Sequence, residues 1–307
     1  MKLPLKGIIP PMVTPLSEAQ TLDCKGLKNL IEHLLEGGVS GIFLLGTNGE
    51  GPSLSYALRK QLISEACNIV DKRVPVLVGI TDTSFGGSLE IAHHAQRAGA
   101  DALVVAPPYY FPLSEKEIID YFRALAPLLP LPFLIYNIPS CTKLNLSPKT
   151  VKSVKELGAI GVKDSSGDEA MLYAFIEAFK DTPDFSVIVG NELFLSNAVL
   201  EGGHGAVAGG ANVFPKLFVA LYEASLSKDK QRITKIQKVI LRMHDTIYKV
   251  EDSPTRSIKA IKCALSIMGI CEDHMAAPLF RLNGNRRSKI EGYLQEFESV
   301  THIRSPL

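Results

Sequence analysis

The sequence predicts an α/β fold: a closed (β/α)8 barrel, or TIM barrel, followed by a C-terminal helical domain. The first observation is an alternation, because eight short apolar segments of strand character are each followed by a segment of helical periodicity. The second is that most strand segments are near-continuous Val, Ile, Leu and Ala, as in parallel strands buried on both faces. The third is the length of 307 residues, because one such barrel uses about 250 residues.

The first unit shows how each element is recognised. A strand is expected at 8–13 and a helix at 23–36, where apolar residues recur at the spacing of one helical face. These residues are Leu27, Leu30, Ile31, Leu34 and Leu35. Gly37 and Gly38 follow, and glycines at this point favour the end of a helix.

Seven further units repeat the pattern. Strands are expected at 41–45, 75–79, 102–105, 133–136, 160–163, 186–189 and 205–208. Helices are expected at 56–70, 88–98, 114–128, 147–157, 168–179, 192–200 and 214–224. An open, doubly wound sheet is the alternative, but Thr14-Pro15-Leu16-Ser17 stands where that fold usually has its glycine-rich turn. We therefore prefer the barrel.

A change of composition marks the second domain. The polar stretch 227–232 follows the eighth unit, and helices are expected after it at 233–250, 255–268 and 289–300. We predict a barrel domain that carries the active site at 1–226 and a helical domain at 227–307.

Composition and charge narrow the possible functions. Hydrophobic residues make up 46% of the chain and the formal net charge is +1, so neither a nucleic acid nor a membrane surface is an expected partner. The five cysteines are scattered without metal-ligand spacing, which favours reduced thiols. The N-terminus lacks the pattern of a signal peptide, and we expect a cytoplasmic protein.

Lys163 is the first candidate for chemistry. It ends the apolar strand 160–163 and precedes a turn rich in Ser, Gly and Asp. One interpretation is a salt bridge with Asp164 or with a carboxylate in a neighbouring loop. The other is that the strand holds the amine partly out of water, which lowers its pKa and makes it a nucleophile toward a ketone.

Other polar residues follow neighbouring strands, and in a barrel the active site forms at these strand ends. Gly46-Thr47-Asn48-Gly49-Glu50-Gly51 offers backbone N–H groups and side-chain donors to a small carboxylate, although it could also be a tight turn that satisfies itself. Tyr136 ends the strand before that of Lys163 and could relay protons to it or be a core aromatic. Tyr109 and Tyr110 suit either a pocket or a subunit contact.

Metal and phosphate chemistry have little support. The seven histidines show no zinc-ligand pattern, and neither a G-x-S-x-G elbow nor a P-loop occurs. The histidines are 33, 93, 94, 204, 244, 274 and 302.

Four motifs in this order resemble the pyruvate-dependent Schiff-base lyases, the family that includes dihydrodipicolinate synthase and N-acetylneuraminate lyase. They are Gly46-Thr47-Asn48-Gly49-Glu50, Pro108-Tyr109-Tyr110, Tyr136-Asn137-Ile138-Pro139-Ser140 and Gly161-Val162-Lys163-Asp164. The similarity runs over nearly the whole chain. It implies the same barrel with its helical domain, and a homotetramer built as a dimer of dimers.

The resemblance also implies residue roles. Lys163 matches the lysine that forms the Schiff base, so no metal or organic cofactor is expected. Tyr136 matches the proton-transfer tyrosine. Thr47 matches the hydroxyl that links it to a second tyrosine, which is Tyr110 here and which the family lends from the adjacent subunit. Gly190 and Val207 match positions near the bound keto acid.

Three departures bear on the substrate. Cys141 stands where the synthases carry an arginine that receives the carboxylate of the second substrate, and a thiol cannot form that bidentate ion pair. Asn48 replaces the second threonine usual in the synthases. Asp164 after the lysine looks more like the sugar-acid aldolases, and Glu192 in Gly190-Asn191-Glu192 suits a polyol.

We therefore expect a class I aldolase, a carbon–carbon lyase that cleaves a 2-keto-3-deoxy sugar acid, or a related 4-hydroxy-2-oxo acid, to pyruvate and an aldehyde. Thr47 and Asn48 are expected to hold the carboxylate of the keto acid. One alternative is dihydrodipicolinate synthase (4-hydroxy-tetrahydrodipicolinate synthase), which condenses pyruvate with aspartate semialdehyde. Another is a keto-acid-binding protein without catalytic activity.

Overall fold

The computed structural model describes residues 1–301 of the chain, with side chains as far as residue 297. It contains one sheet of eight parallel strands in the order β1-β8-β7-β6-β5-β4-β3-β2. The strands are β1 (Gly7–Ile8), β2 (Ile42–Leu44), β3 (Val76–Gly79), β4 (Ala102–Val105), β5 (Phe133–Asn137), β6 (Ala159–Asp164), β7 (Ser186–Val189) and β8 (Gly205–Ala206).

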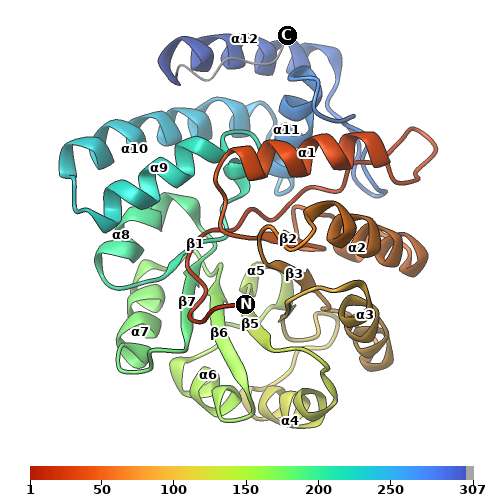
Figure 1. Cartoon of the computed structure of the whole chain (residues 1–307), viewed down its shortest axis with the longest axis vertical. Helices are drawn as coiled ribbons and strands as arrows, with labels where there is room; N and C mark the ends of the chain where they lie inside the picture. The colour runs from red at the N-terminus through yellow and green to blue at the C-terminus, as the bar shows by residue number, and fades with distance from the viewer. Residues whose placement is uncertain (302–307) are drawn as a thin grey trace.

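The sheet closes on itself beside β1. A parallel bridge joins Pro11 to Phe43, and the Met12 N–H donates to the Phe43 carbonyl at 2.9 Å. The predicted barrel is therefore confirmed, with helices around the strands (Figure 1). The first strand is shorter than the expected 8–13, because Pro10 and Pro11 have no N–H to donate to a continuous ladder.

The surrounding helices follow the predicted order, one or more after each strand. They are α1 (Cys24–Glu36), α2 (Tyr56–Val70), α3 (Phe85–Ala98), α4 (Glu115–Leu125), α6 (Pro148–Lys155), α7 (Glu169–Phe179), α8 (Leu195–Leu200) and α9 (Pro215–Leu226). Short pieces accompany them: η1 (Gly51–Ser53), η2 (Ala126–Leu128), α5 (Pro139–Thr142), η3 (Glu192–Phe194) and η4 (Gly209–Asn212).

Two predicted elements are divided in the structure. The helix expected at 114–128 ends at Leu125 and continues as the 3-10 turn η2, where Pro127 removes a backbone donor. The segment expected as one helix at 192–200 splits into η3 and α8. The eighth strand ends at Ala206 instead of 208, but the Val207 N–H still donates to the Val189 carbonyl at 2.8 Å.

Apolar residues fill two layers of core. Alternate residues of the strands point into the barrel, among them Phe43, Leu77, Val104, Leu134 and Ile188. The strand residues between them pack outward against the helices in a larger cluster. Leu5 belongs to the inner cluster and its N–H donates to the Ser186 side chain at 2.8 Å, so the N-terminal segment covers one end of the barrel.

The remaining helices lie together at one side of the barrel, in the blue part of Figure 1. They are α10 (Lys230–Asp245), the turn η5 (Ile247–Lys249), α11 (Arg256–Ile267) and α12 (Gly284–Thr301). Their buried side chains, such as Met243 and Ala264, belong to the same cluster that packs the barrel helices. The predicted boundary at 226/227 falls between α9 and α10 and stays a prediction, as does its end, because 302–307 lie outside the described residues.

Candidate active site

Lys163 lies at the C-terminal end of β6, and its side chain is only 5% exposed. Val162 packs in the outer cluster, so the alternating residue Lys163 faces the inside of the barrel. Burial lowers the pKa of the Lys163 amine, and nearby Tyr136 and Asp164 oppose that effect. The structure thus supplies the partly dehydrated amine that a nucleophilic lysine requires.

Tyr136 stands directly beside Lys163 on the neighbouring strand. The two residues are register partners of β5 and β6, and the Lys163 Nζ lies 3.4 Å from the centre of the Tyr136 ring. The Tyr136 hydroxyl and the Thr47 Oγ1 are 3.5 Å apart. These three predicted residues therefore meet at one point at the barrel mouth.

A hydrogen-bond network fixes the turn that follows Lys163. The Asn137 side chain donates to Asp164 Oδ1 at 2.8 Å, and the Ser166 hydroxyl donates to Asp164 Oδ2 at 2.9 Å. Burial raises the pKa of the Asp164 carboxyl, while these hydrogen bonds lower it. Asp164 is thus bound by donors other than Lys163, and the salt bridge considered from the sequence is not formed.

Ser165 is a site residue that the sequence analysis missed. The Lys163 Nζ donates to the Ser165 Oγ at 3.2 Å, and the Ser165 N–H donates to the Asn137 carbonyl at 2.8 Å. Gly190 leaves room for it, because a Cβ at Gly190 would lie 1.9 Å from the Ser165 Oγ. Its place two residues after a strand-end lysine was the only signal in the sequence.

The loop that carries Thr47 and Asn48 is held by a buried ion pair. Glu50 has a φ of 56°, and its Oε1 lies 2.6 Å from the Nζ of Lys262 on α11. Its Oε2 accepts from the Ala276 N–H at 2.7 Å. Asn48 lies against Gly209, where an added Cβ would come within 2.6 Å of the amide nitrogen of Asn48.

Tyr110 is not among the residues that border the cavity beside Thr47 and Tyr136. It is 77% exposed and packs edge-on against Phe111, which is 69% exposed. Tyr109 lines a cavity of about 260 Å³ together with Thr47, Tyr136 and Cys141. Cys141 therefore borders the same cavity as Tyr136.

The remaining predicted residues lie on the other side of the mouth. Val207 is buried and belongs to the same inner cluster as Tyr136. A second cavity of about 460 Å³, which we call the polar cavity, is bordered by Asn48, Gly190 and Glu192 from the barrel. Its opposite wall comes from α10, η5 and α11. Glu192 is buried there, and its hydrogen-bond partners are His244 of α10, Tyr248 of η5 and Gly210 of η4.

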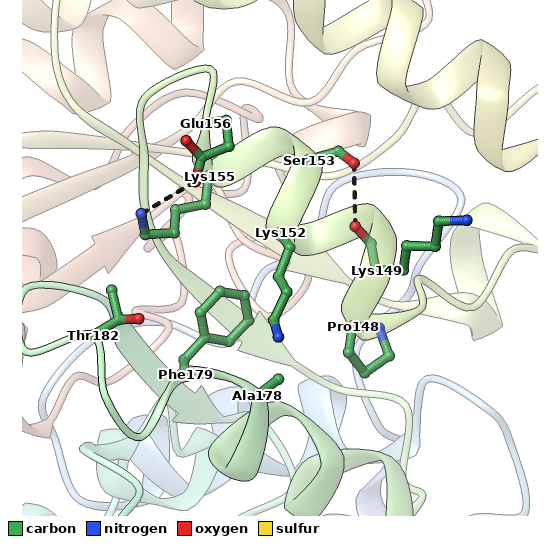
Figure 2. A pocket seen from close by; sticks show the side chains of 9 residues that line it. All are labelled: Pro148, Lys149, Lys152, Ser153, Lys155, Glu156, Ala178, Phe179 and Thr182. Atoms are coloured by element: carbon green, nitrogen blue, oxygen red, sulfur yellow. Dashed lines mark hydrogen bonds and ion pairs between the residues drawn. The ribbon is translucent and has the colours of Figure 1, made fainter.

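A third pocket lies away from the mouth, between α6 and α7 (Figure 2). It measures about 700 Å³ and is bordered by Lys149, Lys152 and Lys155. In the view, the amines of Lys149 and Lys155 point to opposite sides, and Phe179 lies between Thr182 and Lys152. Because its polar groups do not converge and it contains no predicted site residue, the candidate site remains at the barrel mouth.

The part of the chain with described side chains holds no group of three or more His, Cys, Asp or Glu residues arranged to bind a metal. His302 lies outside the described residues. Along the described backbone, no helix combines the length and apolar character needed to cross a membrane.

Known proteins match almost the whole length of this chain. Residues 4–297 match the Dihydrodipicolinate synthetase family. The probable 2-dehydro-3-deoxy-D-pentonate aldolase YjhH of Escherichia coli K12 is 33% identical over 92% of this chain and 94% of its own length. The family match and this relative confirm the expectation of an enzyme of the aldolase type.

Two solved structures have the same fold over almost their full lengths. Dihydrodipicolinate synthase from Bacteroides thetaiotaomicron has a TM-score of 0.94 and 46% identity, over 96% of this chain and 100% of that chain. YagE from Escherichia coli K12, a prophage protein of the dihydrodipicolinic acid synthase family in complex with pyruvate, has a TM-score of 0.90 and 33% identity, over 96% and 99%. The chain therefore belongs to the dihydrodipicolinate synthetase family.

Proposed function

We propose that this protein is a Schiff-base aldolase that reversibly cleaves a 2-keto-3-deoxy sugar acid, or a related 4-hydroxy-2-oxo acid, to pyruvate and an aldehyde. One observation carries the proposal. The buried Lys163 amine, whose pKa is lowered, lies 3.4 Å from the centre of the Tyr136 ring, and the Tyr136 hydroxyl lies 3.5 Å from Thr47. A nucleophile and a group able to transfer protons therefore stand side by side.

The first half of the reaction forms the imine. The neutral Lys163 amine adds to C2 of the keto acid, and the C2 oxygen leaves as water after it takes one proton from the amine nitrogen and one from the Tyr136 hydroxyl. The products are a protonated imine and a tyrosinate. Thr47 and Asn48 hold the carboxylate of the keto acid.

The second half breaks the C3–C4 bond. The tyrosinate accepts the proton of the C4 hydroxyl, the C3–C4 electron pair moves into the imine, and the aldehyde leaves. Tyr136 then returns the proton to C3 of the enamine. Water hydrolyses the imine, which releases pyruvate and restores Lys163 and Tyr136. Because the imine accepts the electron pair, the proposal requires no metal or organic cofactor.

Subunit contacts complete the proposed site. Tyr110 extends the proton relay from a neighbouring copy in a homotetramer built as a dimer of dimers. The exposure of Tyr110 and Phe111 on one loop supports this placement, because such aromatic side chains are enriched at protein interfaces. We place the enzyme in the cytoplasm.

The synthase reaction is the second candidate, and the name of the Bacteroides relative at 46% identity favours it. Cys141 argues against it, because this side chain borders the cavity beside Tyr136 and offers no cation to a second carboxylate. We therefore place the aldolase reaction first.

Borohydride reduction in the presence of pyruvate tests the proposal. We expect mass spectrometry to find a pyruvyl adduct on Lys163, and Lys163→Ala to lack it. Trapped protein that turns over aspartate semialdehyde but no hydroxylated aldehyde would establish the synthase reaction instead. An adduct without turnover of any aldehyde would leave a keto-acid-binding protein, and a missing adduct would remove the mechanism.

A further inference from the structure

The polar cavity at the barrel mouth combines two domains. Its barrel wall includes Asn48, Gly190 and Glu192, and its other wall includes His244 and Tyr248 from the helical domain. Gly190 links the cavity to the catalytic lysine, because its N–H donates to the Asp164 carbonyl at 2.6 Å and its Cα faces Ser165. Gly190 therefore stands between the turn that follows Lys163 and the cavity that His244 borders.

Glu192 is already occupied by protein donors. Its Oε1 interacts with the His244 Nε2 at 2.8 Å and accepts from the Tyr248 hydroxyl at 3.1 Å. Its Oε2 accepts from the Gly210 N–H at 2.7 Å. Three protein donors therefore take three of the roughly four acceptor positions of this buried carboxylate, and its expected role as a direct substrate ligand stays a prediction.

The contact with Glu192 orients the ring of His244. An ionised carboxylate can only accept, so the His244 Nε2–H donates to Glu192 and the Nδ1 atom remains for a second hydrogen bond. Among residues 1–297, the structure shows no hydrogen bond to that Nδ1. The ring is half-buried and packs edge-on against Tyr248, with centroids 4.7 Å apart.

We propose that His244, oriented by Glu192, is a specificity-determining residue whose Nδ1 forms a hydrogen bond with a hydroxyl of the aldehyde part of the substrate. This inference rests on the proposed aldolase function and assigns the substrate class as a polyhydroxylated aldehyde. It also gives the helical domain a direct part in substrate selection. The carboxylate acts through the imidazole, as outer groups do when they orient a histidine ligand.

Two variants distinguish recognition of the substrate by His244 from a purely structural contact between the barrel and the helices that follow it. His244→Gln keeps a side-chain amide near the Nε2 position but removes the polar atom at the Nδ1 position. Tyr248→Phe is the matched control, because it removes a donor to the same Glu192 oxygen and keeps His244. Each is assayed with pyruvate and either glyceraldehyde or propionaldehyde, which lacks the hydroxyls.

We expect His244→Gln to raise KM for glyceraldehyde about tenfold, the size of one lost hydrogen bond. KM for propionaldehyde should stay unchanged, and Tyr248→Phe should change both aldehydes equally. His244→Asn, which returns a polar atom near the Nδ1 position, should restore part of the discrimination. Equal effects of His244→Gln on both aldehydes, or no effect, would overturn the inference.

Trapping of pyruvate by borohydride distinguishes a wrong role for His244 from a wrong assignment of the aldolase function. The wild type and all three variants should form the Lys163 adduct, because His244 does not contact the lysine. If the wild type forms no adduct, the proposed aldolase function fails and this inference fails with it. If adduct and turnover are normal but discrimination does not change, only the role of His244 is wrong.

Discussion

The Nζ of Lys262 lies 2.6 Å from the Oε1 of Glu50, and both side chains are 0% exposed. The pair joins α11 of the helical domain to the barrel loop that carries Thr47. Burial lowers the pKa of the Lys262 amine, whereas the carboxylate of Glu50 opposes that effect. Lys262 also donates to the His274 carbonyl, so neither charge is left without a partner.

We expect Lys262→Met to destabilise the protein by about 3–5 kcal/mol, because it leaves the Glu50 carboxylate buried and unpaired. The double variant Glu50→Gln with Lys262→Met should recover part of that loss. Unfolding in urea gives both values. Lys259→Met is the control on the same helix, since Lys259 pairs with Glu251 within the helical domain. If Lys259→Met and Lys262→Met lose equal amounts of stability, the ion pair with Glu50 stabilises the protein no more than the ion pair with Glu251 does.

The contact between Gly190 and Ser165 predicts a steric effect on the catalytic amine. In Gly190→Ala the new Cβ would lie 1.9 Å from the Ser165 Oγ, so Ser165 must move and displace the turn that follows Lys163. We expect turnover to fall about 100-fold, because small misplacements near the reacting groups are costly.

The double variant Gly190→Ala with Ser165→Gly tests the steric cause. It removes the atoms that the new methyl group meets, so the backbone of the 164–166 turn should return to its place. We expect it to regain activity relative to Gly190→Ala. If the double variant is no better than the single one, the damage arises elsewhere, for instance at the Asp164 carbonyl 3.1 Å away.

Lys163 forms the imine and Tyr136 transfers protons, so we expect loss of the Tyr136 hydroxyl to reduce turnover more than it reduces borohydride trapping of pyruvate. Tyr136→Phe keeps the ring beside the amine but removes the hydroxyl, and we expect turnover to fall about 10²–10⁴-fold. Slow formation of the borohydride adduct should persist, because Lys163 remains. Thr47→Val should have the same sign of effect as Tyr136→Phe, whereas Thr47→Ser should stay close to wild type. Loss of the adduct in Tyr136→Phe would contradict this expectation, because imine formation itself would then require the hydroxyl.

The repeated strand–helix units could be predicted because hydrophobic period and glycine stops are local properties of the sequence. The boundaries were less accurate where side-chain caps decide them. Helix α10 begins at Lys230 instead of 233, because the Asp229 side chain accepts from the Arg232 N–H within a stretch that reads as polar linker. Helix α5 was not predicted, since a helix of four residues is too short to show a periodic pattern of apolar residues.

The candidate site could be predicted only where residues follow successive strands. Lys163 and Tyr136 meet because adjacent parallel strands bring their ends together. His244 and Lys262 could not be placed in this way, because they reach the mouth from helices far away in the sequence. Lys262 did leave a signal, since it interrupts the apolar face of α11 between Ile258 and Leu265. A charge on such a face indicates a buried partner.

The burial of Lys163 also predicts that replacing this lysine stabilises the protein while it abolishes activity. Burial lowers the pKa of this amine below its ordinary value of 10.5, so the folded protein holds the proton less tightly than the unfolded chain. The folded state therefore carries a cost at low pH, and the cost disappears as pH rises from the lowered pKa toward 10.5. Lys163→Met should be more stable than wild type at pH 7, by about 1–2 kcal/mol, although inactive.

The stability advantage of Lys163→Met should shrink as unfolding is measured at increasing pH, whereas Lys152→Met on the exposed side of α6 should show no such trend. A Lys163→Met protein less stable than wild type at pH 7 would mean that packing of the lysine chain outweighs the cost of its charge.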